Sequence, residues 1–297
     1  MEIRNKRILV TGCTGFIGKY LIKVLSKHNK IFCLGRKVDN SIQKSNITHI
    51  NHDLKDKLRA NLLPRDLNHI IHLAAITIRN LDKIDMLISD YYRVNTTSTL
   101  ELLEYGKKVG IDSFIYASTG GVYGYSKDKL TEDSPISPND FHDITKYNSE
   151  MLVNYYSQYF STTILRYFFP YGPGQTNRLI PSLINKIKAG EPITIYNDGR
   201  NPKINPIYIS DAVELTKRSI LLSGENTVNI AGTEVVSILE LSKLIGLLIG
   251  KNVKFKYAVE KRITDMIGDI TKSLSLLGYT PTISLEKGLK RTIGWYK

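Results

Sequence analysis

The sequence predicts an α/β fold in which a doubly wound parallel sheet is joined to a smaller irregular C-terminal domain. Short runs rich in Ile, Val, Phe and Tyr recur along the first half of the chain, and amphipathic stretches separate several of them, an alternation typical of βαβ units. The first apolar run ends in a glycine, and two more glycines follow it at intervals of three residues. After Tyr171, a region rich in proline and glycine interrupts the alternation, which indicates a second, irregular layer.

Six apolar runs are expected to form parallel strands, because strands buried on both faces read as nearly continuous apolar segments. In chain order they are RILVTG at 7–12, KIFCLG at 30–35, ITHINHD at 47–53, HIIHLAA at 69–75, SFIYAST at 113–119 and TTILRYF at 162–168. The clearest helix follows the first run, since Ile17, Leu21 and Leu25 recur at a spacing of four. Residues 226–232 are expected to return to the sheet, and residues 237–251 to form another amphipathic helix.

The net charge indicates an anionic partner. The 297 residues include 41 Lys and Arg against 28 Asp and Glu, which gives a formal net charge of +13. The basic residues are scattered, with no run of about five or more like charges, so we expect a phosphorylated small molecule and no nucleic-acid partner. No apolar stretch approaches the length of about 18 residues that a membrane span needs, and the N-terminus lacks a signal-peptide pattern. We therefore expect a cytoplasmic protein without a membrane partner.

Two cysteines are too few for a disulfide framework or a four-ligand zinc site. Cys13 lies between two glycines of the triplet, and Cys33 lies in the second apolar run. We expect both to be reduced thiols packed in the core, and we expect no metal site.

The glycine triplet predicts a binding site for a dinucleotide. Gly12, Gly15 and Gly18 are three residues apart, and the predicted helix begins within the motif. Glycines allow the backbone to turn tightly and to approach a diphosphate at the positive N-terminus of a helix. This context favours a Rossmann-type coenzyme site over an ordinary turn between a strand and a helix.

The end of the second apolar run bears on the choice of coenzyme. An acidic residue at this place hydrogen-bonds the ribose 2′-hydroxyl of NAD. Here the run ends in Gly35, Arg36 and Lys37, and a guanidinium pairs well with a 2′-phosphate. The sequence therefore favours NADP over NAD, although Asp39 is close enough to keep NAD open.

Further motifs follow the glycine loop in the order typical of one family. They are HDL at 52–54, HLAA at 72–75, YYRVNTTSTLELLE at 91–104, YASTGGVYG at 116–124, LRYFFPYGPGQ at 165–175 and LGYTP at 277–281. With the glycine loop they span nearly the whole chain, and together they resemble the extended short-chain dehydrogenases/reductases of the sugar-nucleotide epimerase/dehydratase family. The resemblance implies a dinucleotide-binding Rossmann domain over residues 1–170 and 205–232, and a sugar-nucleotide-binding domain over residues 171–204 and 233–297.

The resemblance also implies which residues contact the coenzyme. They lie in the glycine loop, at the strand ends beside the adenine and the nicotinamide, and on the catalytic helix. The implied residues are Gly12, Thr14, Gly15, Phe16, Ile17, Gly18, Arg36, Asp53, Leu54, Leu73, Ala74, Ala75 and Lys146.

The catalytic segment departs from the family pattern at one position. Thr119 matches the residue whose hydroxyl hydrogen-bonds the reacting sugar oxygen. The family then places a tyrosine and a lysine four residues apart on a helix, so that the lysine lowers the pKa of the tyrosine. In FHDITKYNSE at 141–150, Lys146 matches the lysine that also binds the nicotinamide ribose, but His142 stands where the tyrosine belongs.

Three interpretations of His142 follow. In the first, it replaces the tyrosine as acid and base, because an imidazole titrates near neutrality and a nearby cation favours its neutral, proton-accepting form. In the second, the site still binds its ligands but has lost efficient redox chemistry and acts as a sensor. In the third, it is a surface histidine, and a tyrosine elsewhere does the work. We favour the first, because the chemistry requires a positioned proton acceptor.

The region after Tyr171 is expected to bind the sugar nucleotide. Arg262 matches the late arginine that contacts the diphosphate in the family, and Arg178 and Lys203 are further candidate cations. Phe169 stands where the family has an asparagine before YGP. The predicted substrate contacts are Thr119, Phe169, Arg178, Lys203 and Arg262.

These residues predict an enzyme that oxidises C4 of a nucleoside-diphosphate hexose transiently with NAD(P), and a UDP-glucose or UDP-N-acetylglucosamine 4-epimerase is favoured. NADPH-dependent reduction of a 4-keto sugar nucleotide is the second expectation. Dehydration is disfavoured, because Gly120 and Gly121 follow Thr119 and bring no carboxylate to take the C5 proton. The helical segments at 96–108 and 146–160 resemble those that form a homodimer in the family.

Overall fold

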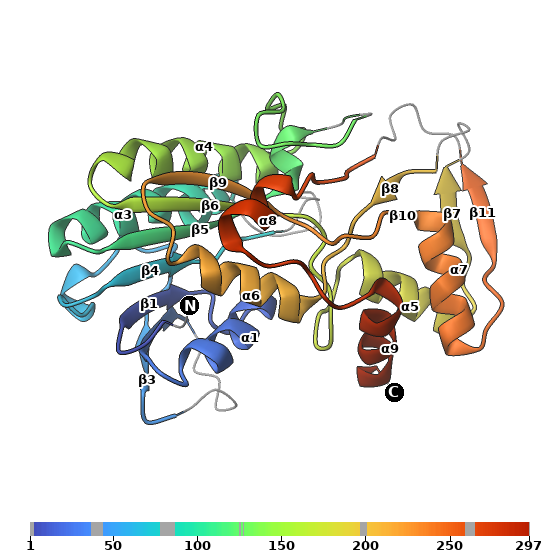
Figure 1. Ribbon diagram of the computed structural model, residues 1–297, viewed down its shortest axis with the longest axis horizontal. Coiled ribbons are helices and arrows are strands. Elements are labelled where there is room, and N and C mark those ends of the chain that lie inside the picture. The colour runs from blue at the N-terminus through green and yellow to red at the C-terminus, as the bar shows by residue number, and fades with distance from the viewer. Residues whose placement is uncertain are drawn as a thin grey trace. The chain divides into compact units, whose positions relative to one another are not determined.

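The computed structural model describes residues 3–36, 44–77, 87–124, 126, 128–196, 201–258 and 265–296 (Figure 1). The chain divides into two compact units. The first comprises residues 1–122, 136–166 and 213–228, and the second comprises residues 123–135, 167–212 and 229–297. The predicted assignment of one part to a dinucleotide and the other to a sugar nucleotide stays a prediction.

A seven-stranded sheet forms the centre of the first unit, in the order β3-β2-β1-β4-β5-β6-β9. Its strands are β1 (Arg7–Thr11), β2 (Lys30–Gly35), β3 (Ile47–Asn51), β4 (His69–His72), β5 (Ser113–Thr119), β6 (Ser161–Tyr167) and β9 (Glu225–Ile230). The pairings among β1 to β5 are parallel. The order reverses between β1 and β4, and in such sheets ligands bind outside the carboxyl ends of the strands at this point. The predicted fold class is confirmed.

The described residues of the first unit include the helices α1 (Phe16–Leu25), α2 (Ile88–Tyr92), α3 (Ser98–Val109) and α4 (Phe141–Tyr155). A π-helical turn, Arg93–Thr97, joins α2 to α3, and α3 and α4 lie side by side (Figure 1). The predicted helix after the glycine loop is confirmed, and its buried face includes Leu21, Ile22 and Leu25. Strand side chains such as Leu9, Ile70 and Phe114 are nearly inaccessible to solvent, because the sheet is covered on both faces.

The second unit is smaller and less regular. It contains α5 (Leu179–Ala189), α7 (Ile238–Ile249), α8 (Thr271–Leu277) and α9 (Leu285–Trp295), while α6 (Ile209–Ser219) begins in it and ends in the first unit. Two short sheets pair β7 (Ile193–Tyr196) with β11 (Phe255–Ala258) in parallel and β8 (Lys203–Ile204) with β10 (Val236–Ser237) in antiparallel fashion. The predicted helix at 237–251 is confirmed, and a capping box of Ser237 and Glu240 sets its start.

Among the helices formed by the described residues, none has the length and apolar character needed to cross a membrane.

Candidate active site

The glycine loop, residues 12–18, runs from the end of β1 into the first turn of α1 and requires glycine at two of its positions. Gly12 has a φ of 73°, and a Cβ there would lie 2.8 Å from the backbone nitrogen of Ala74. A Cβ on Gly18 would collide with the carbonyl oxygen of Gly12. The N–H of Gly15 donates to that same oxygen at 2.9 Å and closes the turn. The loop is therefore packed closely against residues 73–74 and against its own backbone, with no room for side chains at Gly12 and Gly18.

The N-terminus of α1 suits an anion. Gly15 is the N-cap and provides no side-chain hydrogen bond, and the first turn of α1 carries no acidic residue. The first amides of the helix therefore keep their partial positive charge for an external acceptor. Thr14 and Gly15 are exposed, and Phe16 and Ile17 are half-buried. This loop fits the diphosphate bridge of a dinucleotide.

A buried chain of hydrogen bonds fixes the neighbouring strand end. The N–H of Ala74 donates to the hydroxyl oxygen of Thr11 at 3.1 Å, and that hydroxyl lies 2.6 Å from Nδ1 of His72. On the other side of the ring, Nε2 lies 3.1 Å from the hydroxyl of Thr99. Burial lowers the pKa of His72 to about 3, so the ring is neutral near pH 7 and carries one proton. These hydrogen bonds hold residues 73–75 against the glycine loop.

The predicted adenosine edge brings two charged side chains together. The Nη1 atom of Arg36, which follows β2, lies 3.9 Å from Oδ2 of Asp53, which follows β3. The adjacent Leu54 is buried. Asp39, the other acidic candidate, and Lys37 lie outside the described residues. A carboxylate therefore lies beside Arg36, at the place where the sequence suggests a partner for a 2′-phosphate.

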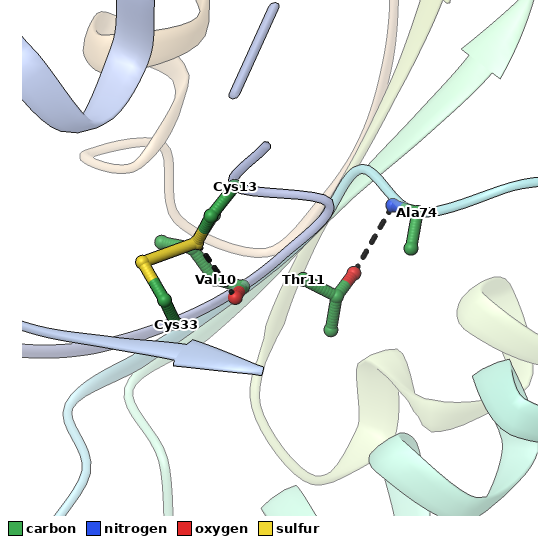
Figure 2. Close-up of a disulfide and its surroundings, with 5 residues drawn as sticks. All are labelled: Val10, Thr11, Cys13, Cys33 and Ala74. Atoms are coloured by element: carbon green, nitrogen blue, oxygen red, sulfur yellow. Dashed lines mark hydrogen bonds between the residues drawn. A yellow bond between two sulfur atoms is a disulfide. The ribbon is translucent and has the colours of Figure 1, made fainter. Parts of the chain in front are cut away.

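A disulfide joins the glycine loop to β2 (Figure 2). It links Cys13 to Cys33, whose Cα atoms are 5.8 Å apart, and both residues are buried. The prediction of reduced thiols is therefore wrong. The parallel pairing of β1 with β2 places Val10 opposite Cys33, and the turn at Gly12 then brings Cys13 to the same place. Residues 20 positions apart become neighbours through a strand pairing that their spacing does not reveal.

Thr119 is the last residue of β5. Its Oγ1 accepts the N–H of Gly121 at 3.1 Å. The preceding residue, Ser118, donates its hydroxyl to Glu150 on α4. At the start of α4, the side chain of Asp140 accepts the N–H of Asp143 at 2.8 Å and caps the helix. The bond from Ser118 to Glu150 therefore joins the carboxyl end of β5 to α4.

His142 is buried in the first turn of α4, with only 7% of its surface exposed. The interpretation of it as a surface histidine is therefore wrong. Its Nδ1 lies 3.1 Å from the carbonyl oxygen of Ile76 and 3.1 Å from the hydroxyl of Tyr91. Because a carbonyl oxygen only accepts hydrogen bonds, the contact with Ile76 assigns the proton to Nδ1. The lone pair of the neutral ring then lies on Nε2, the atom that can accept a proton.

Lys146 lies one turn further along α4 and is 3% exposed. Burial lowers its pKa to about 7, although the carboxylate of Glu150 opposes the shift. Its Nζ lies 4.0 Å from the ring centroid of Tyr116. Glu150 is itself bound by Arg166 at 2.6 Å. Lys146 can therefore hold or release a proton near neutral pH.

Asn95 connects the coenzyme side of the site to α4, a role that the sequence does not reveal. Its side chain pairs with both backbone groups of Ile76, at 2.7 and 3.0 Å, and donates to Thr145 at 3.0 Å. It lies in the π-helical turn between α2 and α3. Asn95 lies in a run of polar residues, 95–99, so the local sequence does not single it out, and irregular helical turns are common at functional sites.

Asp143 is a second residue that the sequence does not place at the site. It is 2% exposed, and a Cβ on Gly121 would lie 2.5 Å from its Cγ. The sequence brings no carboxylate directly after Thr119, but the carboxylate of Asp143 lies against Gly121. The carboxylate comes from the first turn of α4, which is adjacent in space and not in sequence.

The predicted substrate contacts of the second unit lie on several elements. Phe169 has a positive φ of 45°, which is uncommon for a bulky residue. Arg178 is the N-cap of α5 and is exposed, as is Lys203 in β8. Arg262 lies outside the described residues. Their contacts with a sugar nucleotide stay predictions. Within the described part of the chain, no group of three or more His, Cys, Asp or Glu could hold a metal ion.

Comparisons with known proteins agree on one family. The model of the NAD dependent epimerase/dehydratase family matches residues 8–231. An uncharacterized UDP-glucose epimerase of Bacillus subtilis is 32% identical, over 97% of each chain. A UDP-glucuronate 4-epimerase of Thermodesulfobacterium geofontis is 31% identical, over 97% of this chain and 95% of that protein.

Solved structures show the same likeness. The UDP-glucuronic acid 4-epimerase of Bacillus cereus, in complex with UDP-glucuronic acid and NAD, has a TM-score of 0.87 and 28% identity over 97% of this chain and 98% of its own. The UDP-N-acetylglucosamine 4-epimerase of Methanobrevibacter ruminantium, in complex with UDP-N-acetylmuramic acid, has a TM-score of 0.89 and 25% identity over 99% of each chain.

Proposed function

The chain belongs to the NAD dependent epimerase/dehydratase family, and we propose that this enzyme inverts C4 of a UDP-sugar with NAD as its bound coenzyme. The observation that carries the proposal is the placement of His142 and Lys146, two buried titratable residues, in the helix that packs against the strand ending in Thr119. The relatives and solved structures named as 4-epimerases support the reaction type. Among UDP-sugars, we favour the neutral glucose and N-acetylglucosamine forms.

We propose NAD in place of NADP. The UDP-glucuronic acid 4-epimerase structures of Bacillus cereus named with a coenzyme hold NAD, and a carboxylate, that of Asp53, lies beside the guanidinium on which the expectation of NADP depends. The glycine loop would hold the diphosphate, and residues 73–75 and Lys146 would lie beside the nicotinamide and its ribose. Bound there, NAD would supply the oxidation and the later reduction of the sugar carbon.

The chain's own residues would move the proton. The hydroxyl of Thr119 would hold the C4 oxygen by a hydrogen bond, and Nε2 of His142 would take the C4 hydroxyl proton. Ile76 keeps the other ring proton on Nδ1. Lys146, with a pKa near neutrality, would favour the neutral ring when it is charged, and would no longer disfavour the protonated ring when it is neutral. His142 would return the proton when C4 is reduced from the opposite face of the sugar.

The second unit would bind the nucleotide. The guanidinium groups of Arg178 and Arg262 and the ammonium of Lys203 suit the diphosphate of a UDP-sugar. Phe169, with its positive φ, would place its aromatic ring beside the ligand, since strained backbone is often retained at ligand sites.

We also propose a homodimer formed through α3 and α4. Met151 and Tyr155 lie four residues apart on α4, and at least half of each side chain is exposed. Exposed apolar side chains on one helix face often mark a protein interface. Sedimentation should show a dimer for the natural chain and a monomer for the double variant M151E/Y155E.

The proposed activity is tested by supplying the purified protein with NAD and either UDP-glucose or UDP-N-acetylglucosamine. The C4 epimer should form without a lasting change in nicotinamide absorbance, because the coenzyme is oxidised again in each turnover. Consumption of NADPH with a 4-keto sugar nucleotide would instead indicate a reductase. Binding of both ligands without turnover would indicate the sensor, and absence of NAD binding would refute the proposal.

A further inference from the structure

The ammonium of Lys146 lies on the ring of a tyrosine that has no role in the proposed reaction. Its Nζ is over the face of Tyr116, 4.0 Å from the ring centroid. Lys146 is 3% exposed and Tyr116 is fully buried, so water screens the attraction between the cation and the ring only weakly. Burial raises the pKa of Tyr116 well above its ordinary value, and the phenol is therefore neutral near pH 7. The attraction comes from the face of the ring and not from a phenolate.

The packing of β5 against α4 explains this contact. Tyr116 and Ser118 are two residues apart on β5, so their side chains leave the same face of the sheet. Lys146 and Glu150 are four residues apart on α4 and share one face of the helix. Tyr116 contacts Lys146, and Ser118 donates its hydroxyl to Glu150. The strand that ends in Thr119 thus contacts α4 at two points.

The carboxylate nearest to Lys146 on the helix is bound by other groups. Glu150 accepts hydrogen bonds from Ser118 and from Arg166, one of the latter at 2.6 Å. Across the described part of the chain, no hydrogen bond or ion pair joins the ammonium of Lys146 to another residue. Among the described residues, the ring of Tyr116 is therefore the direct partner of this charge.

The other titratable groups around Lys146 do not stabilise its charge. His142 precedes it by one turn on α4, and His72 on β4 is neutral near pH 7, because burial lowers its pKa to about 3. The charge of Lys146 lowers the pKa of His72 in the same direction. The π-helical turn contacts α4 through Asn95 and Thr96, neither of which titrates, and the buried residues of α3 are uncharged. These groups therefore do not offset the burial of the ammonium.

We propose that Tyr116 is a positioning residue for Lys146, and that the face of its ring holds the ammonium in place and stabilises its charge. The inference rests on the proposed function, in which Lys146 lies beside the nicotinamide ribose and assists His142. Burial lowers the pKa of Lys146 to about 7, so a further change of about 1 alters its charged fraction at pH 7 several-fold. A ring that faces a cation shielded from water attracts it strongly enough to cause such a change.

The test removes the ring and follows the charge of Lys146 directly. An NMR titration of protein with isotope-labelled lysine measures this charge, and the signal is assigned by its loss in Lys146→Met. Tyr116→Leu keeps an apolar side chain in the buried position, so the ammonium stays shielded from water but loses the ring. We expect the pKa of Lys146 to fall by about 1, which lowers its charged fraction at pH 7 from about one half to about one tenth. Tyr116→Phe keeps the ring and should keep the pKa.

Phe114→Leu is the matched control. Phe114 is also fully buried on β5, but its ring lies near those of His72 and Phe160. This variant should lower the melting temperature, as Tyr116→Leu does, and leave the pKa of Lys146 unchanged. The part of the pH dependence of kcat that belongs to Lys146 should shift to lower pH in Tyr116→Leu and stay in place in Tyr116→Phe.

Tyr116→Met provides a second variant without the ring if the leucine variant does not fold. An unchanged pKa of Lys146 in a folded variant without the ring would overturn the inference, as would an equal fall in Tyr116→Phe or in Phe114→Leu. Absence of turnover in the natural chain would count against the proposed function alone, because the NMR titration requires neither NAD nor a UDP-sugar.

Discussion

The glycine loop at residues 12–18 and the first turns of α4 are both candidate ligand-binding segments, but the loop uses backbone groups and α4 uses side chains. The loop presents backbone amides, and its shape depends on the absence of side chains at Gly12 and Gly18. In α4, the candidate functional groups are side chains, and residues from other parts of the chain position them. Ile76 and Tyr91, for example, contact the ring of His142. Adding a single methyl group should therefore be enough to impair the loop, whereas impairing α4 requires the removal of a side-chain functional group.

The largest expected effect concerns α4. His142→Phe removes the proton acceptor and keeps an aromatic ring in the buried position. We expect kcat to fall by about 10²–10⁴-fold, the usual contribution of a positioned acid or base, with NAD affinity unchanged. Product formation under saturating UDP-sugar measures the loss. His142→Tyr is the matched variant and should keep much of the activity, because a phenol can perform the same transfer. Full activity in His142→Phe would exclude the imidazole as the acid and base.

The loop should respond in the opposite way, with loss of binding before loss of chemistry. Gly18→Ala would place a methyl group against the carbonyl oxygen of Gly12 and force the loop apart. We expect NAD affinity to fall by about 100-fold or more, as judged by calorimetry, although alanine by itself favours a helix by about 1 kcal/mol. Gly294→Ala in α9 is the control, since a Cβ there meets nothing within 4 Å. It should leave NAD affinity unchanged, and equal behaviour of the two variants would contradict the steric explanation.

The same contrast explains how far the sequence can predict this molecule. The loop is predictable because Gly12, Gly15 and Gly18 are local and adjoin a strand and a helix. The sheet is predictable because its strands are continuous apolar runs. Asn95 and Asp143 are not, since each acts through a contact with a residue at least 19 positions away. Their placement depends on packing between elements, which local patterns do not encode.

The next prediction concerns the contribution of the disulfide between the glycine loop and β2 to the stability of the fold. Cys33→Ala removes the disulfide to Cys13, which lies 20 positions earlier in the sequence. We expect the free energy of unfolding to fall by about 2–4 kcal/mol, mainly because the unfolded chain gains freedom. Denaturant titrations with and without dithiothreitol measure it. The natural chain should lose a similar amount on reduction, and the variant should not respond. If reduction leaves the natural chain equally stable, the link contributes nothing to the fold.

The smallest expected effect concerns Tyr91, which the sequence does not connect with the site. Its hydroxyl lies 3.1 Å from Nδ1 of His142, and its ring packs edge-on against Phe141 with 5.5 Å between centroids. Tyr91→Phe keeps the ring packing and removes one hydrogen-bonding group beside the imidazole. Since such a bond contributes about 0.5–1.5 kcal/mol, we expect kcat to fall by about two- to tenfold while KM and NAD affinity stay the same. If Tyr91 only filled the core, its substitution would lower the melting temperature and leave kcat intact. A lower kcat with unchanged KM and NAD affinity would therefore indicate that Tyr91 positions His142.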